Sequence, residues 1–419
     1  MSKYPLRSLD GLMSIKHGFA FKGEYFSESG HYVVITPGNF LEKGGFKREL
    51  GKEKFYLGEF SEDYLHQQGD LITAMTEQAQ GLLGSCALVP EGGVYLHNQR
   101  IGKIDVNEKY MCKEFVYYLF QTKSVRDQIR LSSTGSKVKH TSPAKIYDVI
   151  APVPSRDEQK LISKVLSQLD KKIAVNNKIN TELEAMAKLI YDYWFVQFDF
   201  PNENGKPYKS SGGKMVYNEE LQREIPEGWG VKELREIEPN IVTGKTPATS
   251  NPENFGGEVP FICIGDVRGN MHITKTEQTL SKLGADSQLK KYVPKGAICV
   301  TCIASPGLVG FATEDSQTNQ QLNTIVCNDV NNRYFLYFYL KDYFRFAKAK
   351  AGNTFANMNK DDFSSIKVIH PGKNTLERFS DTLNSSLDKI LINSKENNKL
   401  AELRDWLLPM LMNGQVTVE

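Results

Sequence analysis

The sequence has few of the residues from which metal sites and disulfide frameworks are built. Its 419 residues include six cysteines and seven histidines. Cys299 and Cys302 form one close pair, with no second pair at zinc-site spacing and no His-x-x-x-His pattern. We therefore expect reduced thiols in a buried strand at these two positions, and no metal ion.

Long apolar runs and a signal sequence are also missing. No segment approaches the roughly 18 apolar residues of a membrane-spanning helix, and the first residues, "MSKYPLRSLDG", lack the apolar stretch of a signal peptide. We expect a cytoplasmic protein with two or three domains. A net charge of +2 neither requires nor excludes nucleic acid as a partner.

A complete nucleotide-binding loop is absent as well. The tripeptide Gly-Lys-Thr at 244–246 ends like a P-loop, but Pro239 occupies the position of the required first glycine and has no N–H to donate to phosphate. The neighbouring "NPEN" at 251–254 half resembles the Asn-Pro-Pro-aromatic motif of amino-methyltransferases, yet lacks its second proline and its aromatic residue. Neither an ATPase nor a methyltransferase site is predicted.

What the sequence does have is an internal duplication with a period of about 220 residues. The matching segments keep their order, and they are "ITPGNF" from Ile35 and "ICIGDV" from Ile262, "QGDLITA" from Gln68 and "KGAICVT" from Lys295, "GLLGSCA" from Gly81 and "GLVGFAT" from Gly307, and "NQRIGKI" from Asn98 and "NQQLNTI" from Asn319. The first two pairs alternate like strands. An aromatic helix follows in each half, "EFVYYLF" from Glu114 and "YFLYFYL" from Tyr334. Its helical spacing favours packing into a core over stacking on bases.

Each half ends in a long helical pattern. Ser155 and Glu158 form a capping box before the first, and Asn374 and Glu377 have the same spacing before the second. Apolar residues recur at sevens, with an asparagine in each helix, which is typical of a coiled coil with one polar layer. The predicted seam comprises Ile162, Leu169, Asn176, Leu183, Ile190, Leu383, Ile390, Asn397, Leu400, Leu403 and Leu407. A helix packed on its own domain's core remains the alternative.

The fold predicted from these patterns is an α+β protein with two similar globular α/β domains separated by two long helices. Equivalent helices that pair about a pseudo-two-fold axis run antiparallel. The polar stretch "FPNENGKPYKSSGGKM" from Phe200 is predicted to be an exposed linker. The expected divisions are a first domain, a first long helix, a central linker, a second domain, a second long helix and a tail, at 1–154, 155–200, 201–228, 229–373, 374–413 and 414–419.

Two separated domains suit a DNA target with two parts. A glycine loop follows the aromatic helix in each half, "SSTGSK" from Ser132 and "KAGNTF" from Lys350. Basic residues and asparagines, most of them near these loops, are candidate contacts to phosphates and adenine edges, although such clusters are also common on solvated faces. The candidates are Lys137, Lys139, His140, Lys145, Lys245, Arg268, Lys348, Lys350, Asn353, Asn357, Asn359 and Lys360.

Several longer segments resemble the specificity subunit of type I restriction-modification enzymes over essentially the whole chain. "TGKTPATSNPENFGGEVPFICIGDV" from Thr243 looks like the entry to a target recognition domain, so the Gly-Lys-Thr belongs to this motif. "FPNENGKPYKSSGGKMVYNEELQREIPEGW" resembles the central linker, "PVPSRDEQKLI" the start of the first long helix, and "LRDWLLPMLMNGQV" the closing helix. "HPGKNTLERFS" lacks the Glu-Gln pair of the first copy, and "HGFAFKGEYF" replaces the Thr-Pro segment in the first domain.

The resemblance implies a non-catalytic subunit that reads a bipartite, asymmetric DNA sequence, one half through each domain. It implies two methyltransferase subunits, which bind S-adenosylmethionine and methylate adenine at N6, and possibly two motor-nuclease subunits, which use ATP and Mg. Cofactors are expected on those partners and none on this chain. Two other classes of function stay open: a methyltransferase in its own right, and a tandem-domain protein scaffold that binds no DNA.

Overall fold

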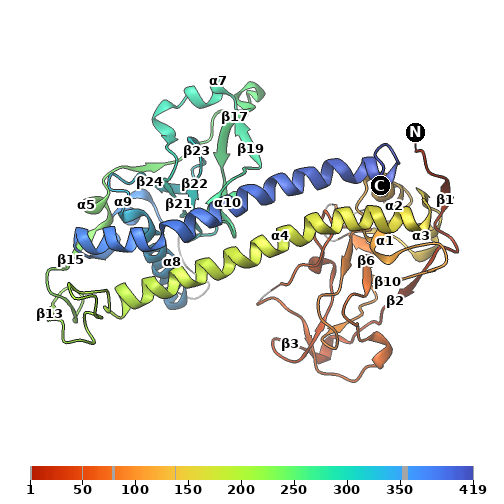
Figure 1. The fold of residues 1–419 in the computed structure, drawn as a ribbon, viewed down its shortest axis with the longest axis horizontal. Helices are drawn as coiled ribbons and strands as arrows, with labels where there is room; N and C mark the ends of the chain where they lie inside the picture. The colour runs from red at the N-terminus through yellow and green to blue at the C-terminus, as the bar shows by residue number, and fades with distance from the viewer. Residues whose placement is uncertain (1, 50, 78–80, 137, 352–356, 419) are drawn as a thin grey trace. The chain divides into compact units, whose positions relative to one another are not determined.

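The computed structural model describes residues 2–49, 51–77, 81–136, 138–351 and 357–418. The chain divides into two compact units, one formed by Met1–Lys171 with Leu400–Glu419 and the other by Lys172–Lys399. Figure 1 shows the course of the chain through both units. Two long helices, α4 (Arg156–Tyr191) and α10 (Lys373–Met412), contribute residues to both.

The first unit is built on a four-stranded antiparallel sheet with the order β2-β10-β6-β8. Its strands are β2 (Met13–His17), β10 (Ile101–Val106), β6 (Leu71–Ala74) and β8 (Cys86–Leu88). A second sheet has the order β3-β5-β4-β9, formed by β3 (Phe26–Ser27), β5 (Phe55–Tyr56), β4 (Tyr32–Val34) and β9 (Tyr95–Leu96). Short pairs join β1 (Leu6–Ser8) to β12 (Ile150–Pro152) and β7 (Thr76–Glu77) to β11 (Lys139–His140).

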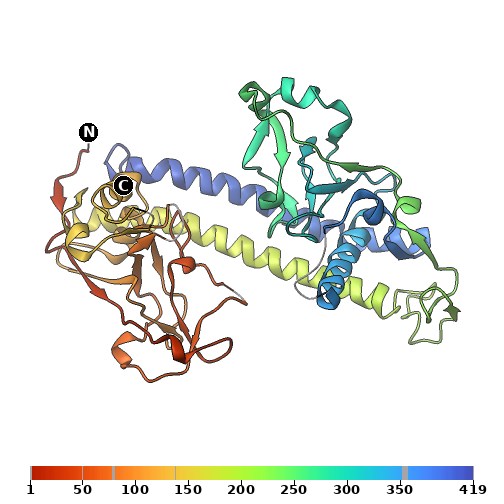
Figure 2. The same ribbon diagram turned by 180° about the vertical axis from the view of Figure 1, so that it is seen from behind.

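Helices from three parts of the chain complete the core of this unit. They are α1 (Lys113–Leu119), α2 (Lys123–Leu131) and α3 (Pro143–Tyr147), together with the start of α4 and the end of α10. Phe115 of α1, Leu166 of α4 and Leu411 of α10 share one buried cluster. Both chain ends lie in this unit, where Lys3 N donates to Asn413 O at 2.8 Å (Figure 2).

The second unit repeats this plan. Its five-stranded sheet has the order β16-β24-β21-β22-β18, and the first four strands match β2-β10-β6-β8 of the first unit. These strands are β16 (Ile241–Thr243), β24 (Leu322–Ile325), β21 (Ile298–Thr301), β22 (Val309–Ala312) and β18 (His272–Ile273). A second sheet, β19-β17-β23-β20, is formed by β19 (Gln278–Leu280), β17 (Phe255–Ile262), β23 (Ser316–Thr318) and β20 (Tyr292–Val293). The shared strand order confirms the predicted duplication.

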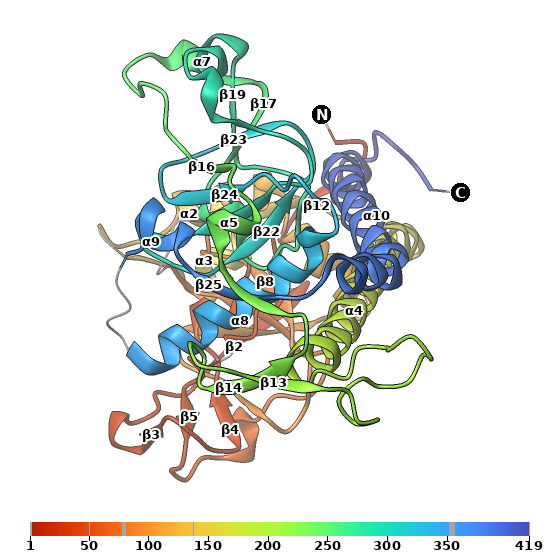
Figure 3. The ribbon, with the colours of Figure 1, turned by 90° about the vertical axis from the view of Figure 1, so that its left-hand side faces the viewer.

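Two further pairs, β15 (Gly230–Glu233) with β25 (Lys367–His370) and β13 (Met215–Asn218) with β14 (Arg223–Pro226), belong to the second unit. Its shorter helices are α5 (Leu234–Ile237), α6 (Ile264–Val267), α7 (Lys282–Asp286), α8 (Asn332–Ala351) and α9 (Lys360–Ser364). Phe335, Phe338 and Phe344 of α8 are buried in the core, as the spacing of this aromatic helix predicts. Figure 3 shows α8 and the β13–β14 hairpin within this unit.

The predicted central linker, 201–228, contains the whole of this hairpin and is anchored at its start. The ring of Phe200 stacks on Tyr208 with centroids 4.6 Å apart and on Trp229 at 4.9 Å. Asp199 accepts hydrogen bonds from the backbone and side chain of Ser210 at 2.7 and 2.5 Å. The intervening residues are mostly exposed, so the stretch is a structured surface segment.

The strand prediction was wrong for "ITPGNF" and for all but the first residue of "ICIGDV". Strand β4 ends at Val34 and β17 ends at Ile262, and each copy then forms a helical turn, Pro37–Asn39 in the first unit and α6 in the second. Asn39 Oδ1 accepts from Thr36 N at 2.8 Å, and Asp266 Oδ2 accepts from Cys263 N at 2.8 Å. The side chain at the third position of the turn competes with strand pairing for that N–H group, which ends the strand.

The start of α4 is as predicted, whereas the start of α10 is not. Glu158 Oε2 accepts from Ser155 N at 3.0 Å, and Ser155 Oγ accepts from Glu158 N at 3.4 Å, which completes the capping box. Helix α10 already begins at Lys373, so Asn374 lies inside its first turn. The predicted box at Asn374 and Glu377 was therefore wrong, because a residue inside the helix cannot cap it.

The residues of the predicted helix seam are buried or half-buried except for Leu403, and its two asparagines meet. Within the second unit α4 and α10 run antiparallel, and Asn176 Nδ2 donates to Asn397 Oδ1 at 2.9 Å. Asn393 Nδ2 donates to Asn180 Oδ1 at 2.9 Å one turn away. Ile162, Leu383 and Ile390 are buried, and Leu169, Leu183, Ile190, Leu400 and Leu407 are half-buried.

Leu403 was wrongly placed in the seam, because its side chain is 43% exposed. Counting seven residues from Asn397 leads to Arg404, whose Nη1 donates to Asp170 Oδ1 at 2.8 Å. Asp170 Oδ2 in turn accepts from the Tyr118 hydroxyl at 2.7 Å. The seam of the first unit therefore contains an ion pair where the leucine was expected.

Candidate nucleic-acid interface

Strand direction brings three loops of each unit to one edge of its central sheet. In the second unit β16 and β21 both pair antiparallel with β24, so their carboxyl ends lie beside the start of β24. We call residues 244–248, 302–308 and 319–321 the loop edge of the second unit. By the same pairing of β2 and β6 with β10, residues 18–22, 75–77, 81–85 and 97–100 form the loop edge of the first unit.

A glycine at each loop edge allows two backbone segments to approach closely. A Cβ at Gly244 would lie 2.1 Å from Asn319 O, and one at Gly18 would lie 2.2 Å from Asn98 O. Neither distance is compatible with any side chain. Gly244 of the Gly-Lys-Thr tripeptide therefore serves packing between loops, in agreement with the failed P-loop spacing.

Three of the candidates in the second unit come together at or beside its loop edge. Lys245 is exposed there. Arg268, which follows α6, donates from Nη2 to Ser305 Oγ at 3.4 Å, and Asn357 Oδ1 accepts from Ala304 N at 3.1 Å. Ala304 has a positive φ of 61°, so the Asn357 bond holds a strained turn in place. Within the described parts of the chain, the amide nitrogen of Asn357 and the Lys245 amine have no hydrogen-bond partner.

The remaining candidates of this unit lie on the helices that follow. Asn359 Oδ1 accepts from Asp362 N at 2.9 Å and caps α9, and its Nδ2 has no partner among the residues that the structure describes. Lys360 is the exposed first residue of α9, and Lys348 is exposed in the last turn of α8. Asn353 lies outside the described residues.

The candidates of the first unit are placed by the short β7–β11 pair. His140 is opposite Thr76 in this pair, with His140 Nδ1 and Thr76 Oγ1 3.2 Å apart. Lys139 is opposite Glu77 and half-buried, and Lys145 is half-buried on α3. Because β7 directly follows β6 and residue 75, this pair adjoins the loop edge of the first unit. Lys137 lies outside the described residues.

Several polar residues at the loop edges were not predicted. Thr246 Oγ1 donates to Gln320 Oε1 at 2.6 Å, and Ser305 accepts from Arg268. Gln99 and Arg100 are exposed at the matching loop of the first unit. The repeated Asn-Gln dipeptides at 98–99 and 319–320 were the available signal, since they mark the same loop in both halves.

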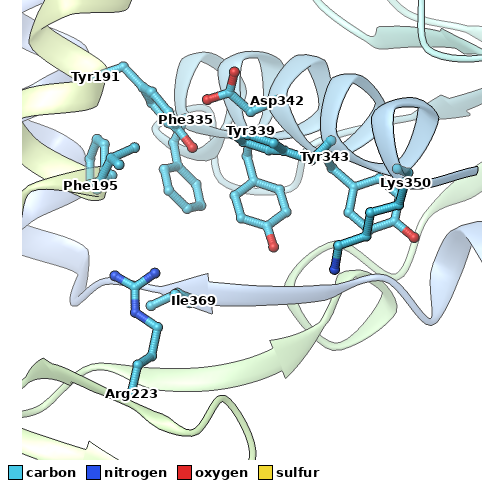
Figure 4. Close-up of a pocket in the computed structure, with 12 residues that line it drawn as sticks. Tyr191, Phe195, Arg223, Phe335, Tyr339, Asp342, Tyr343, Lys350 and Ile369 are labelled. Atoms are coloured by element: carbon cyan, nitrogen blue, oxygen red, sulfur yellow. The ribbon is translucent and has the colours of Figure 1, made fainter.

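A pocket of about 480 Å³ lies in the second unit beside α8 (Figure 4). Aromatic rings dominate its lining, and they belong to Tyr191, Phe195, Phe335, Tyr339, Tyr343 and Phe346. Arg223 and the candidate Lys350 point toward it from different sides. Among the described residues neither cation has an ion-pair partner, although Arg223 lies 4.9 Å from the ring centroid of Phe198, and the carboxylate of Asp342 also lines the pocket.

Metal chemistry finds no support in the described part of the chain. No group of three or more His, Cys, Asp or Glu residues there could hold a metal ion. Cys299 and Cys302 are buried free thiols, and burial raises their pKa values to about 12 and about 11 respectively. Among the helices described, none is long and apolar enough to cross a membrane.

Comparison with known proteins agrees with this two-part architecture. A family model described as the type I restriction modification DNA specificity domain matches residues 1–185 and 226–402. The chain is 31% identical to the HindI specificity subunit of Haemophilus influenzae, with 77% of this chain and 81% of that protein covered. It is 28% identical to the MjaIX specificity subunit of Methanocaldococcus jannaschii, with 74% and 70% covered. The crystal structure of an S subunit from M. genitalium matches 98% of this chain and 96% of its own, at 16% identity and a TM-score of 0.57, which shows a similar fold.

Proposed function

Because this chain belongs to the family of type I restriction-modification specificity subunits and carries two recognition domains, we propose that it reads a bipartite, asymmetric DNA sequence. Each domain would read one half of the target. The observation that carries this proposal is the pair of loop edges, which share a backbone plan but differ in side chains. Equivalent folds with different surfaces favour two different half-sites.

The chemistry of the loop edge in the second unit supports contact with DNA. Lys245 and Arg268 are exposed cations, suited to phosphates and to guanine edges. The free amide nitrogen of Asn357 and the Thr246–Gln320 pair supply short, oriented polar groups. Cations that position the duplex and polar groups that reach bases are the two kinds of contact that sequence-specific recognition requires.

We also propose that the long helices hold two methyltransferase subunits, with motor-nuclease subunits joining in a full restriction complex. An exposed apolar stripe on α4 and the π-helical turn after it supports such docking, and it consists of Met186, Leu189, Tyr193 and Val196. Its 3-4-3 spacing is that of a helix-packing seam, yet these side chains are 39–69% exposed. Val196 also lines the aromatic pocket, where Arg223 and Lys350 favour a partner helix that carries a carboxylate.

The chemistry of modification and cleavage would then belong to the partners. S-adenosylmethionine would be bound by the methyltransferase subunits for adenine-N6 methylation, and ATP and Mg by the motor-nuclease subunits for cleavage. The chain itself would contribute no catalytic group and would act in the cytoplasm.

Methylation mapping by single-molecule sequencing tests the proposal. DNA from cells that express this chain with its methyltransferase partner is compared with DNA from cells that express the partner alone. N6-methyladenine in one split motif, present only with this chain, is the expected result. If both proteins are expressed and associated but no new motif appears, the proposal is wrong and a scaffold that binds no DNA is favoured.

A further inference from the structure

The loop edges of the two units are built on the same backbone hydrogen bonds, so their residues can be matched one to one. In each unit one residue directly follows the third strand of the sheet order, β6 or β21. Its N–H donates to the loop before the second strand of that order, β10 or β24, and its carbonyl accepts from a segment later in the chain. The matching pairs are Met75 N to Arg100 O at 3.0 Å and Cys302 N to Gln321 O at 2.8 Å, and Thr141 N to Met75 O at 3.0 Å and Met358 N to Cys302 O at 2.9 Å. The match is therefore set by geometry and not by sequence alignment alone.

This geometry places Phe19 where the second unit has Lys245. Phe19 N donates to His97 O at 2.8 Å, and Lys245 N donates to Thr318 O at 2.9 Å. Each of the two residues follows the glycine that packs against the facing loop. The first unit thus presents an aromatic ring at the position where the second presents an exposed cation.

The ring of Phe19 is held rigidly at the surface. It contacts Phe21 edge to face, with centroids 5.3 Å apart and planes at 80°, and Tyr64 at 5.3 Å. Its side chain is nevertheless 38% exposed. The Lys16 amine lies 5.3 Å from the centroid of Tyr64, so a positive charge adjoins the braced ring. An exposed ring beside a cation, on a surface that adjoins DNA, is suited to a base that offers an apolar group.

The packing of Phe21 and Tyr64 against Phe19 limits how the Phe19 ring can contact a base. A ring inserted between base pairs must project freely from the protein, whereas Phe21 and Tyr64 cover part of Phe19 on two sides. An edge contact remains, and the thymine 5-methyl group is the apolar group that base pairs present in the major groove. We propose that Phe19 recognises a thymine methyl group in the half-site read by the first domain. The inference rests on the proposed function, since it requires DNA at the loop edges.

Deoxyuridine substitution tests this contact at the level of one methyl group. The complex of this chain with its methyltransferase partner is titrated with duplexes that carry the mapped motif, in which each thymine is replaced in turn by deoxyuridine. One position, in one half-site, is expected to weaken binding roughly fourfold, as the loss of one buried methyl group predicts. The Phe19→Ala complex should bind thymine and deoxyuridine equally at that position.

Two further variants separate this contact from loss of folding or of charge. Lys245→Ala, at the matched position of the second unit, should weaken binding overall and keep the fourfold difference. Phe19→Leu should retain part of it, because an apolar side chain remains.

Three results would overturn the assignment. They are a wild-type complex that binds the motif without any deoxyuridine effect, an unchanged effect in Phe19→Ala, and half-sites made only of G·C pairs. In each of these cases the complex still prefers its motif, so the proposed function stands. A wild-type complex with no sequence preference overturns both.

Discussion

Lys360 is the exposed first residue of α9 and lies directly after the Asn359 cap. If its amine contacts a phosphate, Lys360→Ala should weaken binding to all DNA sequences alike. The slope of log affinity against log salt should become shallower by about 0.9, the value for one phosphate contact. Binding titrations at several salt concentrations measure this slope.

Lys206→Ala is the matched control, because it removes the same charge from an exposed residue of the segment between α4 and β13. An equal loss of DNA affinity in Lys206→Ala would show that the effect of Lys360→Ala comes from the change in net charge alone. A changed sequence preference in Lys360→Ala would assign Lys360 to a base and not to a phosphate.

His97 makes the stability of the first unit depend on pH. Burial lowers the pKa of His97 to about 3, whereas an unfolded histidine titrates near 6.5. As pH falls below about 6.5 the unfolded chain takes up the proton first. The stability is therefore complete above that pH and is lost progressively as the pH falls toward 3. The free energy of unfolding should decrease by up to about 1.4 kcal/mol per pH unit from this residue.

Urea denaturation at pH 7 and pH 5 measures this decrease. His97→Gln removes the titration but keeps a donor for Ile101 O, which lies 3.0 Å from His97 Nε2. The stability of the variant should depend less steeply on pH. Part of the dependence should remain, because burial also lowers the pKa of His272, to about 4. If the free energy of unfolding fell equally with pH in the wild type and in His97→Gln, His97 would not be the titrating group.

Among the elements, the long helices and the strands of the duplicated sheets were predictable, whereas their exact ends were not. Periodicity identifies a 36-residue and a 40-residue helix because the pattern is averaged over many turns. The start of α10 depends on which of several adjacent polar residues precedes the first turn, which spacing does not decide. The Leu403 error has a similar cause, since hydrophobicity selected a leucine where the geometric repeat selects Arg404.

The asparagine layer between α4 and α10 costs stability and can fix register. Asn176 is fully buried and donates to Asn397. Asn176→Leu should destabilise the chain by about 1–3 kcal/mol, because Asn397 Oδ1 and Glu396 Oε2 each lose the hydrogen bond from Asn176 Nδ2. The double variant Asn176→Leu, Asn397→Leu should recover this loss. A double-mutant cycle by urea denaturation checks the coupling, and strictly additive effects would show that the two residues act independently.

The π-helical end of the exposed stripe and the adjoining aromatic pocket make the proposed docking testable. Val196→Asp and Phe346→Asp each place a carboxylate on apolar surface that is 50% and 60% exposed, respectively. Each should weaken association with the methyltransferase subunit roughly ten- to hundredfold, as expected for one buried apolar side chain. Calorimetric titration measures this. Leu57→Asp changes a leucine that is 67% exposed in the first unit and should have no effect. Equal weakening in all three variants would contradict the docking surface.

At the scale of the whole molecule, the duplicated plan was readable from the sequence, but the recognition surfaces were not. The order of the repeated segments revealed two equivalent domains. The match between Phe19 and Lys245 could not be seen, because one is aromatic and the other charged, and only their backbone bonds to His97 and Thr318 make them equivalent. Recognition residues differ in chemistry between the copies, so similarity does not find them.

We propose that the paired long helices set the separation of the two half-sites, and this predicts the effect of lengthening both helices. Seven residues inserted between Lys171 and Lys172, with seven between Lys399 and Leu400, keep the heptad phase of both helices. At 1.5 Å per residue this adds about 10.5 Å, or about three base pairs of 3.4 Å each. Methylation mapping should show the same two half-sites with a spacer about three base pairs longer. An unchanged spacer would contradict the helices as its determinant.

The packing of Leu408, Leu411 and Met412 into the first unit has a consequence for biosynthesis. The residues they cover, Ile162 and Leu166 among them, leave the ribosome about 240 residues earlier. At 5–20 residues per second this delay is roughly 12–50 s. During this time Ile162 and Leu166 lack these packing partners. A chain that is released early therefore lacks part of the core of its first domain.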